Sequence, residues 1–203
     1  MSDNYEYHYE GAEFYCYPNT NVLINKLGIK DKEKLNKFER KIVAVRILAF
    51  MENPPKPTLD FKHICDIHKF LFEDLYEWAG KIRDGDFMFK GDSMFYRACF
   101  IESGFNEMYG KLEKENFLKG LDKDNFCERL AYYMGFLDAL HPFREGNGRT
   151  MRLYFQQLAE QAGYDIQFSK TTKEKLLEAD ISAFNTDYEP LIALLKTIIT
   201  KNN

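Results

Sequence analysis

The sequence has little of what marks a secreted, membrane-spanning or nucleic-acid-binding protein. Among 203 residues there are 4 cysteines, in no paired spacing, and no apolar run approaches the roughly 18 residues of a spanning helix. Lys and Arg number 28 against 32 Asp and Glu, without a cationic block. Because phosphate-backbone binding rests on clustered cations, we expect no nucleic-acid partner. We also expect no membrane partner, packed and reduced cysteines, and a cytoplasmic location unless the protein is exported.

What is present is enough apolar material for one sizeable core. Hydrophobic residues make up 45% of the chain and aromatic residues 16%. A chain of this length buries roughly 70% of its unfolded surface, so neither disulfides nor a structural metal is needed. We expect an all-α domain with one small β-hairpin. Residues 1–30 are predicted to be an N-terminal segment that packs on the main domain, residues 31–203.

Apolar residues recur at helical spacing along most of the chain. The first stripe consists of Phe38, Ile42, Val45, Leu48 and Ala49, before prolines that end the helix. Thr58 is the expected N-cap of a second helix that stops at Ala79-Gly80, and Asn125 with Glu128 resembles a capping box. We predict further helices over residues 100–115, from 125 to about 141, from after 148 to 163, over 172–183 and over 188–200.

Residues 86–95 depart from this helical pattern. Two short apolar runs lie on either side of Lys90-Gly91-Asp92-Ser93. Such an arrangement is typical of a β-hairpin with a four-residue turn.

The chemistry concentrates in His141-Pro-Phe-Arg-Glu-Gly-Asn-Gly-Arg-Thr-Met-Arg152, which lies between two expected helices. The N–H groups of Gly146, Asn147 and Gly148 can converge on an anion at the start of the second helix. Arg149 and Arg152 are three residues apart and therefore share a helical face. Polyphosphate is the anion that two such cations fit best.

Two further residues of this segment can support a reaction on phosphate. Glu145 supplies a hard oxygen ligand for Mg²⁺ shared with substrate phosphates. Histidine side chains can accept a proton from a hydroxyl at neutral pH, so His141 is a candidate general base. A base, a metal ligand and a cationic anion cradle are the parts that phosphoryl-type transfer requires.

This segment resembles the signature of the Fic family (filamentation induced by cAMP), H-P-F-x-[DE]-G-N-G-R-x-x-R, and meets every fixed position. Family members also carry a segment similar to Tyr76-Glu-Trp-Ala-Gly-Lys-Ile-Arg83, which enters a hairpin called the flap. A stretch similar to Tyr15-Cys-Tyr-Pro-Asn-Thr-Asn-Val-Leu-Ile-Asn-Lys-Leu-Gly28 is common among them too. The resemblance spans roughly residues 15 to 200 and implies that 31–203 is a Fic-type catalytic domain.

The resemblance implies a protein adenylyltransferase, which moves AMP from ATP to a Ser, Thr or Tyr hydroxyl of a target protein or, in self-modification, of the enzyme. His141 would be the general base and Glu145 the Mg²⁺ ligand. The anion hole would be Gly146, Asn147 and Gly148. Arg149 would contact the β-phosphate and Arg152 the γ-phosphate. In the flap, Lys90 and Gly91 match family nucleotide-site positions, and the hairpin would bind the target by strand addition.

Two comparisons within the family refine this interpretation. The kinase-like Doc branch replaces the second motif glycine with lysine, whereas Gly148 is intact here. Many members carry an inhibitory helix of pattern [ST]-x-x-x-E-[GN]. Here the nearest approach, from Ser103 to Met108 with Glu107 in the glutamate position, fails at the last residue. We therefore expect an isolated chain that is active, or one inhibited by a separate antitoxin-like partner.

Other interpretations stay open at this level. The protein could be a catalytically silent module that binds a nucleotide or a partner, or the same scaffold could transfer phosphate or phosphocholine. His63 and His68 are five residues apart, about 140° around a helix, so we expect packed or capping roles rather than a metal pair. Neither G-x-x-x-x-G-K-[ST] nor G-x-G-x-x-G occurs, which excludes the common nucleotide-binding motifs.

Overall fold

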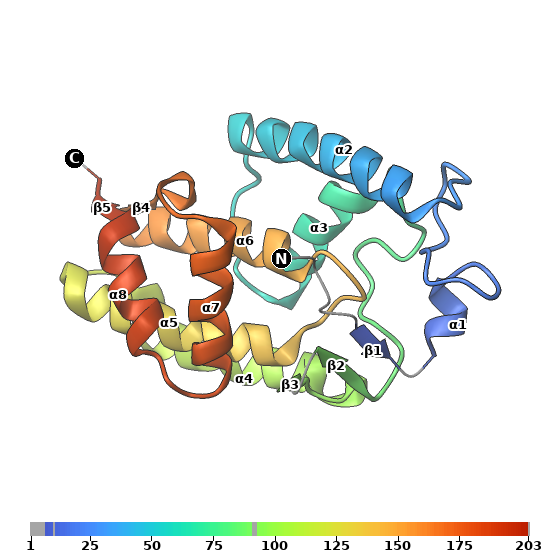
Figure 1. The fold of residues 1–203 in the computed structure, drawn as a ribbon. Helices are drawn as coiled ribbons and strands as arrows, with labels where there is room; N and C mark the ends of the chain where they lie inside the picture. Colours follow the sequence, from blue (N-terminus) through green and yellow to red (C-terminus); the bar gives the residue numbers. More distant parts are fainter. Residues whose placement is uncertain (1–6, 10, 91–92, 203) are drawn as a thin grey trace.

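A computed structural model describes residues 7–9, 11–90 and 93–202. Its helices are α1 (Ala12–Tyr15), α2 (Lys32–Glu52), α3 (Phe61–Phe72), α4 (Ile101–Lys114), α5 (Lys123–Leu140), α6 (Asn147–Ala162), α7 (Lys173–Phe184) and α8 (Glu189–Ile198) (Figure 1). Its strands are β1 (Tyr7–Tyr9), β2 (Met88–Lys90), β3 (Ser93–Met94), β4 (Tyr164–Ile166) and β5 (Ile199–Lys201). The predicted all-α class with a small hairpin is confirmed.

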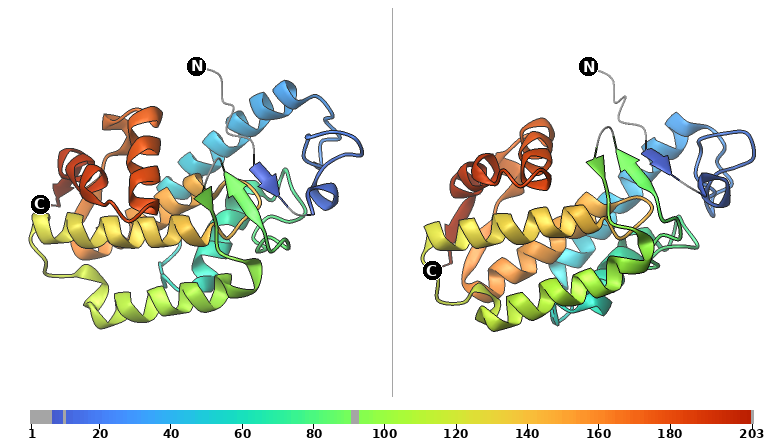
Figure 2. Two further views of the ribbon diagram at one scale, coloured as in Figure 1. Left: turned by 60° about the horizontal axis from the view of Figure 1, so that its bottom comes forward. Right: turned by 90° about the horizontal axis from the view of Figure 1, so that it is seen from below.

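Helix α5 forms the centre of the fold and contacts α4, α6, α7 and α8. In Figure 2 it lies, in yellow, between the red α7–α8 pair and the lime-green α4. Its residues Leu130, Tyr133 and Leu137 are buried. The contact with α4 is close because Gly104 has no side chain: a Cβ there would lie 2.7 Å from a methyl group of Leu140. The glycine within α4 therefore serves helix packing.

The predicted hairpin over residues 86–95 is present as β2 and β3, with Phe89 opposite Met94. The structure adds a third strand from the N-terminal segment, where the sequence has only weak strand character. Strand β1 pairs antiparallel with the other edge of β2, with Tyr9 opposite Met88, so the sheet order is β1-β2-β3 (Figure 2). The turn residues Gly91 and Asp92 lie outside the described residues.

Several helix ends differ from the predictions. The N-cap of α3 is Asp60 rather than Thr58, since its side chain accepts the N–H of His63 at 2.8 Å. Similarly, Asp122 rather than Asn125 caps α5 and accepts the N–H of Asn125 at 2.9 Å. In both cases the carboxylate immediately precedes the first helical residue, which is the N-cap position.

The ends of two helices also differ. Helix α3 stops at Phe72, not at Gly80. The chain leaves the helix in turns after Phe72, but apolar residues such as Leu75 are still buried, which made the helical pattern seem to continue. The last helix stops at Ile198 rather than Thr200. Residues 199–201 instead form β5, which pairs with β4. Strand β4 follows Gly163, which caps the end of α6 as predicted.

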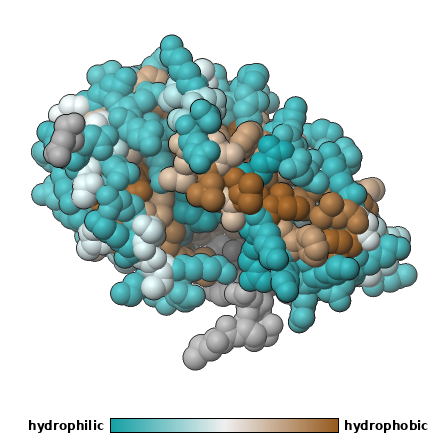
Figure 3. All heavy atoms as spheres, turned by 90° about the horizontal axis from the view of Figure 1, so that it is seen from above, coloured by the Kyte–Doolittle hydropathy of each residue, from teal (hydrophilic) through white to brown (hydrophobic). Residues whose placement is uncertain are grey.

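The apolar stripe of α2 does not face the core as helical periodicity suggested. Val45 and Leu48 are 66% and 63% exposed, whereas Leu35, Val43 and Phe50 on another face are buried. Helix α2 packs mainly on α3, so only a narrow face is covered. Figure 3 shows brown apolar atoms exposed on this side of the molecule, among teal polar ones. The buried face also carries a carboxylate, Glu39.

The N-terminal segment contacts the rest of the chain. The N–H of Lys26 donates to the carbonyl of Leu75 at 2.8 Å, and the Tyr15 hydroxyl donates to Asp84 at 3.0 Å. These contacts are those expected of a segment that packs on the main domain. The division at residue 30 stays a prediction.

The cysteines are not in disulfides, as predicted, but they are not all packed. Cys16 and Cys127 are buried, whereas Cys99 is exposed. Cys99 lies in a short 3₁₀ turn, Ala98–Phe100, of which no residue is buried. None of the helices within the described part of the chain combines the length and apolar character that a bilayer crossing requires.

Candidate active site

The motif segment forms a compact reversal between α5 and α6. Helix α5 ends at Leu140, and His141 takes a left-handed conformation with φ 42°. Gly146, with φ 85°, caps α6. The side chain of Asn147 holds this reversal closed, because it donates to the carbonyl of Phe143 at 2.7 Å and accepts the Phe143 N–H at 2.9 Å. Asn147 thus stabilises the loop through its side chain, a role that its expected place in the anion hole did not include.

Gly146 is constrained by more than its backbone angle. A Cβ at this position would lie 2.3 Å from the ring of Phe72 at the end of α3. The aromatic ring therefore packs directly on the loop backbone. Because α6 begins at the next residue, the N–H groups of Asn147 and Gly148 have no acceptor within the helix and carry the positive end of its dipole.

His141 is buried beneath the hairpin. Its ring stacks on that of Phe95, with centroids 3.8 Å apart and planes 19° apart. Its Nδ1 faces two acceptors, the Asp138 carbonyl at 3.3 Å and the Asp138 carboxylate at 3.5 Å. We therefore assign the proton of the neutral ring to Nδ1, which leaves the basic lone pair on Nε2.

The hairpin reaches the motif through Phe95, whose N–H donates to Met88 at 3.0 Å. Of the two flap residues predicted for the nucleotide site, Lys90 ends β2, where its backbone pairs with Ser93. Gly91 lies outside the described residues. The predicted roles of these two residues stay predictions.

Glu145 and Arg149 lie close together on one side of the loop. The Glu145 carboxylate is 30% exposed, accepts the N–H of Gly146 at 3.0 Å, and lies 3.6 Å from the Arg149 guanidinium. A second carboxylate is closer to the arginine: Glu39 of α2 binds Arg149 Nη2 at 2.8 Å. The guanidinium also lies over the Phe72 ring, 4.8 Å from its centroid.

Arg152 lies one helical turn further along α6. Burial lowers the pKa of its guanidinium, and the negative charge of Asp180 on α7 opposes that shift. A Cβ on Gly148 would lie 3.3 Å from Arg152 Nη1. Hence Arg152 folds back over the first turn of α6, and a larger residue at 148 would crowd it.

His68 of α3 anchors the loop from below. The N–H of Gly80 donates to its Nδ1 at 2.8 Å, so the ring proton is on Nε2, which donates to the Glu145 carbonyl at 3.0 Å. The ring also stacks on Phe143 at 3.9 Å. Burial lowers the pKa of His68 to about 3, so the ring is neutral at pH 7.

Sequence reasoning gave His63 and His68 packed or capping roles, and both are indeed buried and hydrogen-bonded. It did not indicate that His68 holds the motif loop, and it missed Glu39 entirely. The available signals were weak. Glu39 was one of three glutamates in a highly charged helix, and no local spacing links it to Arg149.

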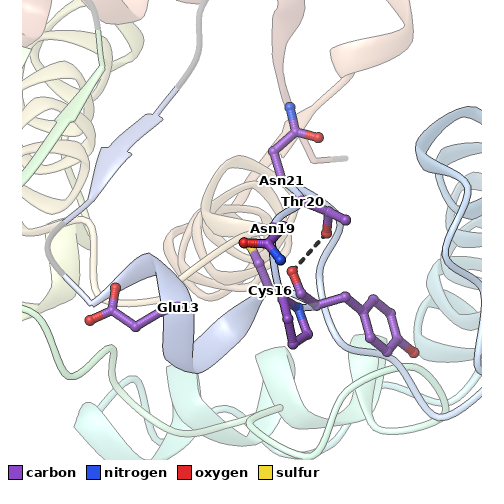
Figure 4. Close-up of a pocket in the computed structure, with 7 residues that line it drawn as sticks. Glu13, Cys16, Asn19, Thr20 and Asn21 are labelled. Atoms are coloured by element: carbon purple, nitrogen blue, oxygen red, sulfur yellow. Dashed lines mark hydrogen bonds between the residues drawn. The ribbon is translucent and has the colours of Figure 1, made fainter.

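A hollow elsewhere on the surface has different chemistry. It is formed by α1 and the turn that follows, with the Thr20 hydroxyl bound to the Tyr17 carbonyl at 2.9 Å (Figure 4). Its lining residues are Glu13, Cys16, Tyr17, Pro18, Asn19, Thr20 and Asn21. That lining contains no cation and none of the motif residues.

Comparison with known proteins agrees with this geometry. Residues 58–159, which include the whole loop and its anchors from α3, match the Fic/DOC family. The chain belongs to the Fic/DOC family. This confirms the resemblance drawn from the motif.

Among its relatives, this Fic/DOC chain is 39% identical to the protein adenylyltransferase VbhT of Bartonella schoenbuchensis, over 95% of this chain but 40% of VbhT. It therefore spans less than half of that relative. It is 35% identical to the probable protein adenylyltransferase Fic of Salmonella typhimurium, over 99% of this chain and 98% of the relative.

The fold likewise matches solved structures of the family. One is the BepC protein of Bartonella tribocorum, a VirB-translocated effector crystallised with bound AMPPNP. It superposes with a TM-score of 0.88 at 30% identity, over 94% of this chain and 98% of that one.

Proposed function

We propose that this Fic/DOC protein is a protein adenylyltransferase that transfers AMP from ATP to a Ser, Thr or Tyr hydroxyl of a target protein and releases pyrophosphate. The observation that carries the proposal is the intact loop at the start of α6, where His141, Glu145 and Arg149 are held by a fixed set of contacts. The names of VbhT and the Salmonella relative support the same activity.

In the proposed reaction His141 is the general base. As the target oxygen bonds to the α-phosphorus, Nε2 takes the hydroxyl proton, and the bond from that phosphorus to the bridging oxygen breaks. Asp138, which accepts from Nδ1, stabilises the imidazolium that forms. Arg149 and Arg152 bind the β- and γ-phosphates and offset the charge on the departing pyrophosphate.

Glu145 is the residue of this loop that fits a Mg²⁺ ion. It is a partly exposed carboxylate beside the expected phosphate position. No cluster of three or more metal-ligating side chains occurs within the described ranges, so phosphate and water oxygens would supply the other ligands, as is usual for Mg²⁺. When bound, the ion neutralises phosphate charge.

The alternatives differ in what the site would have to lose or change. A phosphate-transferring kinase of the Doc type carries lysine at position 148, where a side chain would crowd Arg152. A silent module would not need both the base and the metal ligand. The glycine and the complete set of side chains therefore favour AMP transfer.

Regulation is part of the same proposal. Glu107, the nearest match to an inhibitory glutamate, binds Lys111 on its own helix at 2.8 Å. We propose that the isolated chain is active and that a separate antitoxin-like protein supplies any inhibition. The cytoplasmic location, or export as an effector, stays a prediction.

The proposal is tested with ATP labelled at the α- or the γ-phosphate, incubated with the protein, Mg²⁺ and a lysate as the source of targets. We expect only the α-label to become protein-bound, and we expect His141→Ala to abolish transfer while retaining ATP binding by calorimetry. Bound γ-label alone would indicate a kinase. Tight ATP binding with neither label transferred would indicate a silent module.

A further inference from the structure

The buried face of α2 carries a carboxylate that reaches the motif. Glu39 is 8% exposed and lies among the apolar residues that attach α2 to the fold. A buried carboxylate is costly unless it is paired and hydrogen-bonded. Both of its oxygens have partners: Oε1 binds Arg149 Nη2 at 2.8 Å, and Oε2 accepts the hydroxyl of Tyr76.

Tyr76 secures Glu39 from the side opposite the arginine. It is 1% exposed, and burial together with the Glu39 charge raises the pKa of its hydroxyl. The hydroxyl is therefore protonated and donates. A carboxylate fixed in this way cannot swing toward solvent, so it defines one position for the guanidinium that it binds.

The other contacts of Arg149 lead to the same conclusion. Its guanidinium lies over the face of Phe72, 4.8 Å from the centroid, and that ring also packs on Gly146. A guanidinium has five N–H donors, and both neighbouring carboxylates, Glu39 at 2.8 Å and Glu145 at 3.6 Å, lie against Nη2. The ring limits its tilt and the carboxylate limits its rotation, which leaves further donors for a ligand.

Electrostatics require a compensating charge here. Arg149 and Arg152 both lie in the first two turns of α6, where the helix dipole disfavours cations. Glu39 places a negative charge against Arg149 from outside the loop. It can thus stabilise the arginine before any phosphate is bound.

We propose that Glu39 is a positioning residue that holds Arg149 in the orientation that binds the β-phosphate. The proposal rests on the proposed function for its choice of phosphate. Glu39 does not contact the nucleotide itself. Since it acts through Arg149 alone, its removal weakens binding of nucleotides that have a β-phosphate and leaves AMP binding unchanged.

The test is calorimetric titration of ATP, ADP and AMP, each with Mg²⁺, into the full chain. We expect Glu39→Ala to weaken ATP and ADP binding by about tenfold or more, the range for a charge-assisted hydrogen bond, and AMP binding by less than about twofold. Glu33→Ala is the matched control, because Glu33 is an exposed glutamate in the first turn of α2. It should alter none of the three affinities.

A double variant separates positioning from a general structural effect. Once Arg149→Ala is present, Glu39→Ala should cause no further loss of ADP affinity, because residues that act as a unit are not additive. Equal losses for AMP and ADP, additive losses in the double variant, or tighter ATP binding by Glu39→Ala would each overturn the proposal. Tighter binding would mean that Glu39 competes with the phosphate.

Two further variants keep the test decisive. If the melting temperature shows that Glu39→Ala does not fold, Glu39→Gln retains the volume and should give a smaller loss restricted to ATP and ADP. If Arg149→Ala itself leaves ADP affinity unchanged, the assigned phosphate contact is wrong. Failure of Glu39→Ala alone leaves the proposed AMP transfer intact, since that is measured by α-label transfer.

Discussion

Single side chains around the motif loop determine its shape. Asn147 bonds both backbone groups of Phe143, and His68 donates to the Glu145 carbonyl. Neither contact involves the atoms expected to touch a nucleotide. The proposed chemistry of this loop therefore depends on residues whose own role is geometric.

Gly146 is the residue whose contribution to the shape of the loop can be measured most directly. Gly146→Ala places a side chain at φ 85° and against the Phe72 ring. We expect a loss of about 1–3 kcal/mol in the free energy of unfolding from the backbone strain alone, measured by urea denaturation. The control is Gly110→Ala, within α4, where a Cβ has open space and should stabilise by about 0.5–1 kcal/mol. Equal effects of the two changes would contradict this account.

The sequence predicted the members of the site better than their connections. The spacing of His141, Glu145 and Arg149 was sufficient to place them on one loop and helix start. Their supports come from distant segments, Glu39 in α2 and His68 in α3. Such pairings depend on tertiary packing, which local periodicity does not encode.

Helix α2 shows where periodicity itself misleads. Its most regular apolar stripe, with Val45 and Leu48, is exposed, and the face that packs on α3 carries Glu39 and Val43. The existence of the helix was predictable from its apolar spacing, and its end from the prolines that follow. Which face of α2 is buried was not predictable, because α2 packs mainly on α3 and no other element of the described chain covers its apolar stripe.

Two valines of α2, two residues apart, test this orientation. Val43→Ala removes buried methyl groups and should cost about 1.5–3 kcal/mol of unfolding free energy. Val45→Ala, the same change at a residue that is 66% exposed, should stay within about 0.5 kcal/mol. Urea denaturation of both variants gives the comparison. A larger loss at Val45 would place the wrong face of α2 on the core.

For the molecule as a whole, buried neutral histidines link stability to pH. Burial lowers the pKa of His68 to about 3, from an ordinary value of 6.5, and also lowers the pKa of His63. Between pH 6.5 and 3 the unfolded chain therefore binds a proton at His68 that the folded chain does not. Stability from this residue is complete above pH 6.5 and is lost as the pH falls.

The unfolding free energy should accordingly decrease on acidification, with His68 contributing at most about 1.4 kcal/mol per pH unit. His68→Gln, which cannot titrate, should reduce that slope between pH 6 and 5. Between pH 7 and 8, where His68 is neutral in both states, variant and wild type should have the same slope. Urea denaturation across this series checks both statements, and identical slopes at acid pH would show that His68 is charged in the folded protein.

The three-stranded sheet has a consequence for how any extended polypeptide could approach the flap. One side of β2 is bonded to β3 and the other to β1, which comes from the beginning of the same chain. An incoming segment that pairs with β2 on the side of β1 must therefore displace residues 7–9 and replace their backbone hydrogen bonds. Binding at that side of β2 is therefore strand exchange, in which the incoming segment competes with residues 7–9 for the same backbone hydrogen bonds.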